Sequence, residues 1–333
     1  MMRATLLLLC FTAFASVNAE PCVTATTDCT EWIKLGPQAQ ALVYRTYSLS
    51  TRNDKVIRAL IVVHGAGRDA DNYFRTVLAA AFLAHALEDT IIISPRFASN
   101  DGQRCRDTLA ANEINWSCSG ESWRSGASAT NNNKLTSYDL MDEILRELAR
   151  KAVFPNLKSV VLCGHSAGGQ YVTRYEMANQ VHDRLGFPIS YVVSNPSSYA
   201  YLDPERPAGA NSELRPFTDA RNCTTYNNWP YGLKKRNGYT ASLSDDLLKQ
   251  QLAARPVTYL LGEIDILPLG GFDSSCPAMA QGSTRLARGQ AFANYINQKY
   301  HAGHKLIVVP LCGHNARCMF TAEAALPILF PKQ

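Results

Sequence analysis

Short apolar runs rich in β-branched residues alternate with helical patterns from about residue 40 to the C-terminus. This alternation is typical of strands joined by crossover helices in a mostly parallel sheet. The runs at 57–63 and 90–94 are continuously apolar, as in strands that are buried on both faces. Seven strands are predicted in all, over 42–48, 57–63, 90–94, 159–163, 189–194, 257–261 and 305–309.

Two of the intervening segments carry clear helix signals. Residues 72–87 are alanine-rich, with larger apolar residues at helical spacing. Thr136 and Asp139 form a predicted capping box, and the apolar face of residues 140–148 then predicts a helix that ends before Pro155. The predicted fold class is therefore α/β, with a mostly parallel central sheet and helices on both of its faces.

Two long stretches, at about 97–135 and 195–255, break this rhythm with Gly, Pro, Ser and Asn and several aromatic residues. Each follows a predicted strand, at the sheet edge where α/β proteins place their binding sites. We expect these insertions to form the walls or the lid of a site. Candidate substrate contacts are Trp116, Trp123 and Tyr199 from the insertions, together with His165.

The first 19 residues have the pattern of a secretory signal peptide, with a basic start, an apolar run and small residues before position 20. No later stretch approaches the roughly 18 apolar residues that span a bilayer. We therefore expect residues 20–333 to form one secreted domain, extracellular or periplasmic, without a membrane span.

Cysteine usage supports an oxidising compartment. Ten cysteines are present, and nine remain without Cys10 in the signal segment. Sequence proximity favours the pairs Cys22–Cys29, Cys105–Cys118, Cys223–Cys276 and Cys312–Cys318, although other connectivities stay open. Cys163 lies inside an apolar strand and is expected to be free. No C-x-x-C pair or H-E-x-x-H helix occurs, so no metal site is predicted.

Charge adds little. The chain carries a net charge of +5, and its densest basic cluster, at 234–236, suits a solvated loop. No nucleic-acid partner is expected. The oligomeric state is left open.

The most informative motif is the run Gly164-His165-Ser166-Ala167-Gly168 between a predicted strand and a helical pattern. A G-x-S-x-G run at a sharp strand-to-helix turn exposes the serine hydroxyl above the sheet. Ser166 is therefore the candidate nucleophile.

A serine nucleophile needs a base and an acid that orients the base. His314 follows the last predicted strand, and the Cys312–Cys318 pair would clamp its loop. Asp265 follows the strand before it and is the favoured acid. Glu263 and Asp203 remain as alternatives.

The oxyanion of such a reaction needs donors that are already in place. The N–H of Ala167 is one candidate. The turn at 64–67 offers a second, with Ala66 favoured over Gly67.

With these motifs in this order, the chain resembles the α/β-hydrolase superfamily, and within it the secreted serine esterases. The resemblance covers about residues 40–330 and implies cofactor-free hydrolysis of carboxylic esters through an acyl-enzyme. The substrate would be a small-molecule or polymer-borne ester. A peptidase, amidase or lactonase on the same triad remains an alternative, as does a catalytically silent extracellular binding protein.

Overall fold

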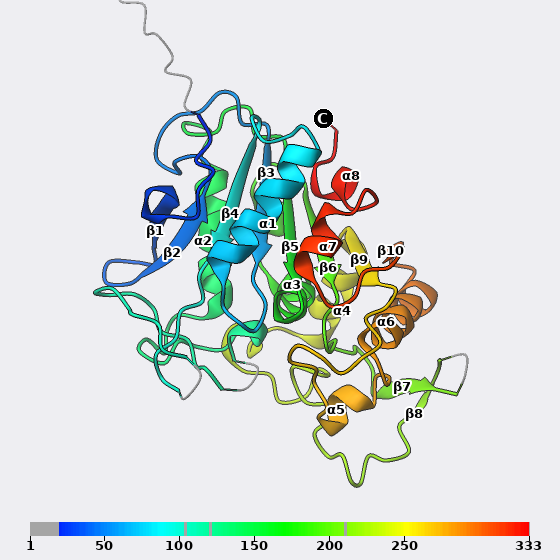
Figure 1. Ribbon diagram of the computed structural model, residues 1–333. Helices are drawn as coiled ribbons and strands as arrows, with labels where there is room; N and C mark the ends of the chain where they lie inside the picture. Colours follow the sequence, from blue (N-terminus) through cyan, green and yellow to red (C-terminus); the bar gives the residue numbers. More distant parts are fainter. Residues whose placement is uncertain (1–19, 103–104, 120–121, 210–211, 333) are drawn as a thin grey trace, which may run out of the picture.

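The computed structural model describes residues 20–102, 105–119, 122–209 and 212–332 (Figure 1). Its centre is an eight-stranded sheet in the order β1-β2-β4-β3-β5-β6-β9-β10. The strands from β4 to β10 in this order are parallel, and β1 and β2 are antiparallel at one edge. The bounds are β1 Thr30–Lys34, β2 Gln40–Arg45, β3 Arg58–Val63, β4 Thr90–Pro95, β5 Ser159–His165, β6 Ile189–Ser194, β9 Val257–Gly262 and β10 Lys305–Val309; β7 Glu205–Ala208 and β8 Glu213–Pro216 form a separate hairpin.

Helices cover both faces of the sheet (Figure 1). One face packs against α1 Ala70–Leu83, α7 Ala316–Thr321 and α8 Leu326–Leu329. The other packs against α2 Ser137–Leu148, α3 Ala167–Ala178, α4 Asp245–Ala254 and α6 Arg285–Tyr300. Shorter helices are α5 Cys276–Met279, η1 Thr27–Cys29, η2 Trp123–Ser125, η3 His182–Arg184 and η4 Gly238–Thr240.

The two-sided burial explains the continuous apolar runs. In β5, Val160 and Leu162 belong to the core under α3, whereas Val161 and Cys163 belong to the core under α1. Alternate side chains of a strand point to opposite faces, so a strand between two helix layers must be apolar at every position. The predicted fold class is confirmed.

All seven predicted strands are present, but some boundaries differ. β2 begins at Gln40 and ends at Arg45, earlier than predicted, and α1 likewise begins and ends earlier than the predicted 72–87. The capping box is confirmed, because Thr136 Oγ1 accepts from the Asp139 N–H and the Asp139 carboxylate accepts from the Thr136 N–H. The edge strand β1 was not predicted, because its run Thr30-Glu31-Trp32-Ile33-Lys34 contains only two apolar residues.

The cysteines pair as predicted, in Cys22–Cys29, Cys105–Cys118, Cys223–Cys276 and Cys312–Cys318. Cys163 is free and buried. The predicted signal segment, 1–19, lies outside the described residues, and the single-domain organisation stays a prediction. Within the described ranges, no helix is long and apolar enough to cross a membrane.

Candidate active site

Ser166 lies at a strained turn between β5 and α3. Its φ of 59° is unusual for a residue with a side chain. Its neighbours must be small, because a Cβ on Gly168 would lie 2.1 Å from the Val63 carbonyl oxygen and one on Gly164 would lie 2.4 Å from Gly168. The two glycines thus let β3, β5 and α3 approach closely enough to hold Ser166 at the end of the sheet.

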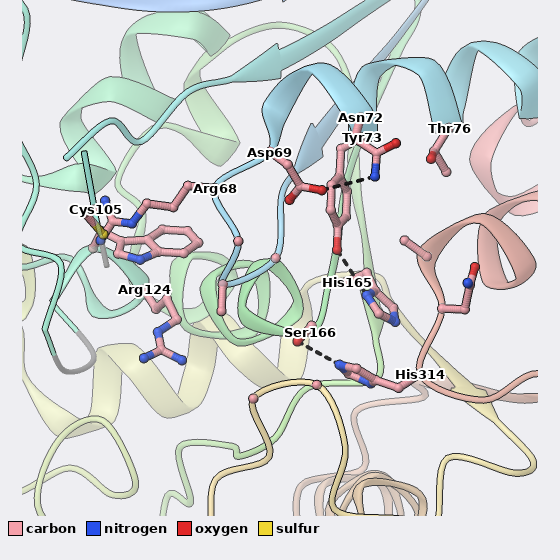
Figure 2. Close-up of a pocket in the computed structure, with 18 of the residues that line it drawn as sticks. Arg68, Asp69, Asn72, Tyr73, Thr76, Cys105, Arg124, His165, Ser166 and His314 are labelled. Atoms are coloured by element: carbon pink, nitrogen blue, oxygen red, sulfur yellow. Dashed lines mark hydrogen bonds between the residues drawn. The ribbon is translucent and has the colours of Figure 1, made fainter. Parts of the chain in front are cut away.

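Ser166, His314 and Asp265 form a continuous hydrogen-bonded chain. Ser166 Oγ lies 2.9 Å from His314 Nε2, and Figure 2 marks this hydrogen bond with a dashed line. His314 Nδ1 lies 2.8 Å from Asp265 Oδ2, and the Asp265 residue is 1% exposed. This arrangement has the geometry of a nucleophile, a base and an acid that orients the base. The structure therefore brings together the three residues that the sequence singled out.

The two alternative acids face elsewhere. Glu263 Oε2 accepts from the Leu311 N–H at 2.9 Å. Asp203 accepts from the hydroxyls of Tyr295 and Tyr300 at 2.6 and 2.7 Å, and it pairs with Lys299 at 2.9 Å. Neither carboxylate contacts His314.

Arg285, which no sequence motif singles out, holds the second oxygen of Asp265. Its Nη1 lies 3.3 Å from Asp265 Oδ1, and its Nε donates to Ser197 Oγ at 2.7 Å. Its Nη2 donates to the carbonyls of Leu269 and Gly270 at 2.7 and 3.0 Å. Burial lowers the pKa of Arg285, and the Asp265 carboxylate opposes that shift. No local pattern marks an arginine on a helix as buried, so nothing in the sequence signals this contact.

The turn after β3 is fixed by a buried histidine. His64 Nδ1 donates to the Gly65 carbonyl at 2.8 Å, and Nε2 accepts from the Phe97 N–H at 3.2 Å. Burial lowers the pKa of His64 to about 4, so the ring is neutral near pH 7. Ala66 and Gly67 of this turn line the same cavity as Ser166. Ala167 begins α3, where backbone N–H groups have no partner within the helix.

His165 packs directly beside His314. The two ring centroids are 4.6 Å apart, and Tyr73 Oη lies 3.1 Å from His165 Nδ1 (Figure 2). Burial is the main cause that lowers the pKa of His165 well below its ordinary value, and the neighbouring His314 adds to it. Burial also raises the pKa of Tyr73. Both groups are therefore neutral at pH 7 and place no fixed charge next to His314.

Ser166 and His314 open onto a cavity of about 970 Å³. Figure 2 shows Arg68 and Arg124 across the cavity from His314. The lining is largely polar and consists of Gly65, Ala66, Gly67, Arg68, Asp69, Asn72, Tyr73, Thr76, Cys105, Arg106, Asp107, Cys118, Trp123, Arg124, His165, Ser166, Gly270, Gly271, His314, Asn315, Ala316 and Arg317. Among the described residues, no cluster of His, Cys, Asp and Glu is suited to a metal ion.

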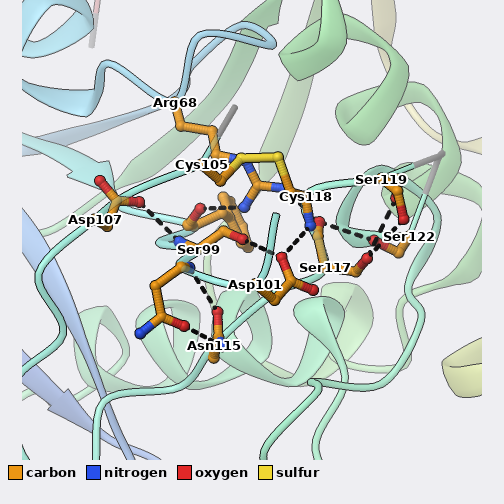
Figure 3. Close-up of a disulfide and its surroundings, with 12 residues drawn as sticks. Arg68, Ser99, Asp101, Cys105, Asp107, Asn115, Ser117, Cys118, Ser119 and Ser122 are labelled. Carbon is orange, nitrogen blue, oxygen red and sulfur yellow. Dashed lines mark hydrogen bonds between the residues drawn. A yellow bond between two sulfur atoms is a disulfide. The ribbon is translucent and has the colours of Figure 1, made fainter. Parts of the chain in front are cut away.

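The insertion at 97–135 supplies one wall of this cavity, as expected. Figure 3 shows its Cys105–Cys118 disulfide beside Arg68. Arg68 donates to the carbonyls of Phe97 and Ser117 at 2.7 and 2.5 Å. The Asp101 carboxylate accepts from the Cys118 N–H at 2.8 Å. The Arg68 bonds tie the wall to the turn after β3, and the Asp101 bond holds the wall together internally.

The expectations for the other aromatic contacts require correction. His165 and Trp123 line the cavity, but Trp116 and Tyr199 do not. Trp116 packs against Phe97 in the core, and Tyr199 stacks on Phe292 at 4.5 Å between ring centroids. Loop aromatics that fill a core look the same in sequence as those that face a ligand. Of residues 195–255, none that the structure describes lines the cavity, so the second insertion is not a wall of it.

The sheet order and the nucleophile turn define the class of protein, an α/β hydrolase. The chain belongs to the alpha/beta hydrolase family, whose model matches residues 60–326. This membership supports hydrolase activity. No match was found among curated proteins.

Solved structures share the fold. One is a poly(3-hydroxybutyrate) depolymerase from Bordetella parapertussis, with a TM-score of 0.61, 22% identity, and coverage of 89% of this chain and 85% of that one. Another is a poly(aspartic acid) hydrolase from Sphingomonas sp. KT-1, with a TM-score of 0.63, 20% identity, and coverage of 90% and 97%. At identities of 22% and 20%, the similarity to these two structures shows a shared fold and nothing more.

Proposed function

We propose that the protein is a secreted serine hydrolase that cleaves carboxylic esters. The observation that carries the proposal is the chain from Ser166 Oγ through His314 to Asp265, with contacts of 2.9 and 2.8 Å. A serine hydroxyl bonded to an imidazole that is oriented by a buried carboxylate is activated for attack on a carbonyl.

In the proposed reaction, Ser166 attacks the ester carbonyl while His314 Nε2 takes the hydroxyl proton. Asp265 stabilises the imidazolium and keeps Nδ1 protonated. His314 then gives the proton to the leaving alcohol, and an acyl-enzyme remains on Ser166. Water activated by the same imidazole releases the acid. No cofactor takes part in this scheme.

The developing oxyanion would be held by backbone N–H groups. Ala167 supplies one at the start of α3, and Ala66 supplies the other, with Gly67 as the alternative in that turn. The positive end of the helix dipole at the first turn of α3 adds to this stabilisation. Loss of one such donor typically lowers turnover by about 10²–10³-fold.

Export is part of the proposal. Four disulfides are compatible with an oxidising compartment outside the cytosol. The signal-like residues 1–19 agree with this location. The wide, polar cavity suits a small-molecule ester or a segment of a polymer-borne ester.

The direct test compares acyl transfer from alcohol and amine leaving groups. Purified protein should hydrolyse p-nitrophenyl acetate or butyrate and leave the matching p-nitroanilides nearly untouched, while Ser166→Ala falls to the background rate. Faster cleavage of the anilide would support the peptidase or amidase alternative. A folded protein that hydrolyses no ester, lactone or amide would support the binding-protein alternative.

A further inference from the structure

Figure 1 shows the loop that joins β9 to α5 at the end of the sheet strand β9. Large apolar side chains on this loop are exposed. Ile264, Ile266, Leu267 and Leu269 are 50%, 51%, 57% and 61% exposed, and Leu311, after β10, is 79% exposed. We call these five residues the apolar rim. Single exposed apolar residues are ordinary on protein surfaces, but a cluster of them marks an interaction site.

The two segments that carry the apolar rim lie side by side. The Ile264 N–H donates to the Cys312 carbonyl at 3.1 Å, and the Leu311 N–H donates to Glu263 at 2.9 Å. Ile264 also lies against Gly313, where a Cβ would be 3.7 Å from its Cγ1. The loop after β9 and the loop that carries His314 are therefore joined at the rim.

The rim adjoins the candidate active site. Gly270 and Gly271, which follow Leu269, line the cavity, and a Cβ on Gly270 would lie 2.9 Å from His314 Cδ2. Arg285 bonds the carbonyls of Leu269 and Gly270 while it contacts Asp265. The loop is thus anchored to the same buried group that holds the acid of the site.

The charge of the rim indicates a neutral partner. Between residues 264 and 270 the one charged side chain is Asp265, which is buried. The adjoining Glu263 is exposed and acidic. Anionic membranes attract Lys and Arg, and the apolar rim supplies neither.

The lining of the cavity beside the rim further restricts the chemical class of the partner. Four arginines and two aspartates line it, with Trp123 and Tyr73 as its large aromatic members. A long-chain lipid would need an apolar channel for its acyl chain. A polymer with closely spaced ester groups can enter a polar cavity while its bulk presents an apolar face.

We propose that the apolar rim docks the enzyme onto the surface of a water-insoluble aliphatic polyester, so that a chain segment at that surface reaches Ser166. The cleavage of that segment rests on the proposed function. The docking itself needs no catalysis.

Adsorption to a poly(ε-caprolactone) film tests the docking directly. The parent protein is Ser166→Ala, so that no hydrolysis alters the film, and the rim variant adds Leu267→Ser and Leu311→Asn. A matched control adds Phe82→Ser on α1, a side chain that is 70% exposed outside the cavity lining. We expect the rim variant to adsorb about tenfold more weakly, because each exposed Leu would bury apolar area on the film, and the control to adsorb like the parent.

The same substitutions in the active chain should leave turnover of p-nitrophenyl acetate within about twofold, since exposed side chains are usually replaced at small energetic cost. Equal adsorption of the parent and the rim variant would overturn the proposal. So would rim-dependent binding to phosphatidylglycerol vesicles without binding to the film, or a dimer that the rim substitutions dissociate in size-exclusion chromatography. Rim-dependent adsorption in a chain without esterase activity would uphold the docking and reject the proposed function.

Discussion

At the scale of single residues, the acid of the site is fixed on both of its oxygens. Asp265 Oδ2 contacts His314 at 2.8 Å, and Oδ1 contacts Arg285 at 3.3 Å. A carboxylate held in this way cannot rotate without the loss of one partner. The orientation of the His314 ring therefore depends on Asp265 and, through it, on Arg285.

Asp265→Asn should lower kcat for p-nitrophenyl butyrate by about 10³–10⁴-fold, because an amide no longer selects the His314 tautomer that accepts the Ser166 proton. Steady-state kinetics measure the change. Glu263→Gln is the control and should stay within a few-fold of wild type. If the Glu263 variant loses more activity than the Asp265 variant, the assignment of the acid is wrong.

The sequence pointed to Ser166 and His314 because each has a local motif or a place in the chain order that the chemistry requires. It could not separate Trp123, which lines the cavity, from Trp116, which does not. Both are aromatic residues in a polar insertion, and their burial differs through contacts made by distant segments. The role of Arg285 could not be predicted from the sequence for the same reason.

At the scale of elements, a buried carboxylate connects α2, α3 and the insertion at 195–255. Asp142 on α2 accepts from the Tyr175 hydroxyl at 2.6 Å and from the Tyr239 hydroxyl at 2.8 Å. Burial raises the pKa of Asp142 to about 6, although the two hydroxyls act in the opposite direction. The helix that follows Ser166, α3, is thus supported by a group that titrates in the mildly acidic range.

The raised pKa of Asp142 predicts the direction in which the stability of the fold changes with pH. Between about pH 4 and 6 the folded chain binds the Asp142 proton more tightly than the unfolded chain, so this group's contribution to stability is lost as the pH rises. Asp142→Asn removes that dependence. From pH 4 to 7, the free energy of unfolding of wild type should fall relative to the variant by about 2–3 kcal/mol.

Urea denaturation of both proteins at the two pH values measures the difference, in which contributions from other groups cancel. A difference that does not change with pH would show that Asp142 titrates normally in the folded chain.

The central strands of the sheet were predictable because burial on both faces requires a continuous apolar run in the sequence. β1 was not, because its five residues include only two apolar ones, whereas the opposite edge strand, β10, has four consecutive apolar residues and was predicted. The shape of the two insertions depends on disulfides and side-chain networks between distant segments, which periodicity does not encode.

At the scale of the whole molecule, disulfides brace the loops around a rigid sheet. Cys312–Cys318 brackets His314, and Cys105–Cys118 lies in the cavity wall. Cys223–Cys276 joins the insertion at 195–255 to α5. Cys22–Cys29 closes a loop of similar length to that of Cys312–Cys318, but it contributes nothing to the cavity lining.

The double variant Cys312→Ser/Cys318→Ser should lose about 2 kcal/mol of stability, because its unfolded chain gains conformational entropy without the disulfide. It should also lose kcat, because the loop that carries His314 is no longer clamped. Cys22→Ser/Cys29→Ser should lose similar stability and keep its kcat. Thermal unfolding and ester kinetics on both variants separate the two effects, and an equal loss of kcat in both would refute a local role for Cys312–Cys318.

The proposed chemistry depends above all on the activation of Ser166 by His314. Its most direct test is mass spectrometry of the folded, disulfide-intact chain after treatment with a fluorophosphonate, with Ser166→Ala and His314→Ala alongside. We expect one adduct, on the peptide that contains Ser166, and its loss in both variants. A wild-type chain that stays unlabelled, or labelling that persists without His314, would contradict it.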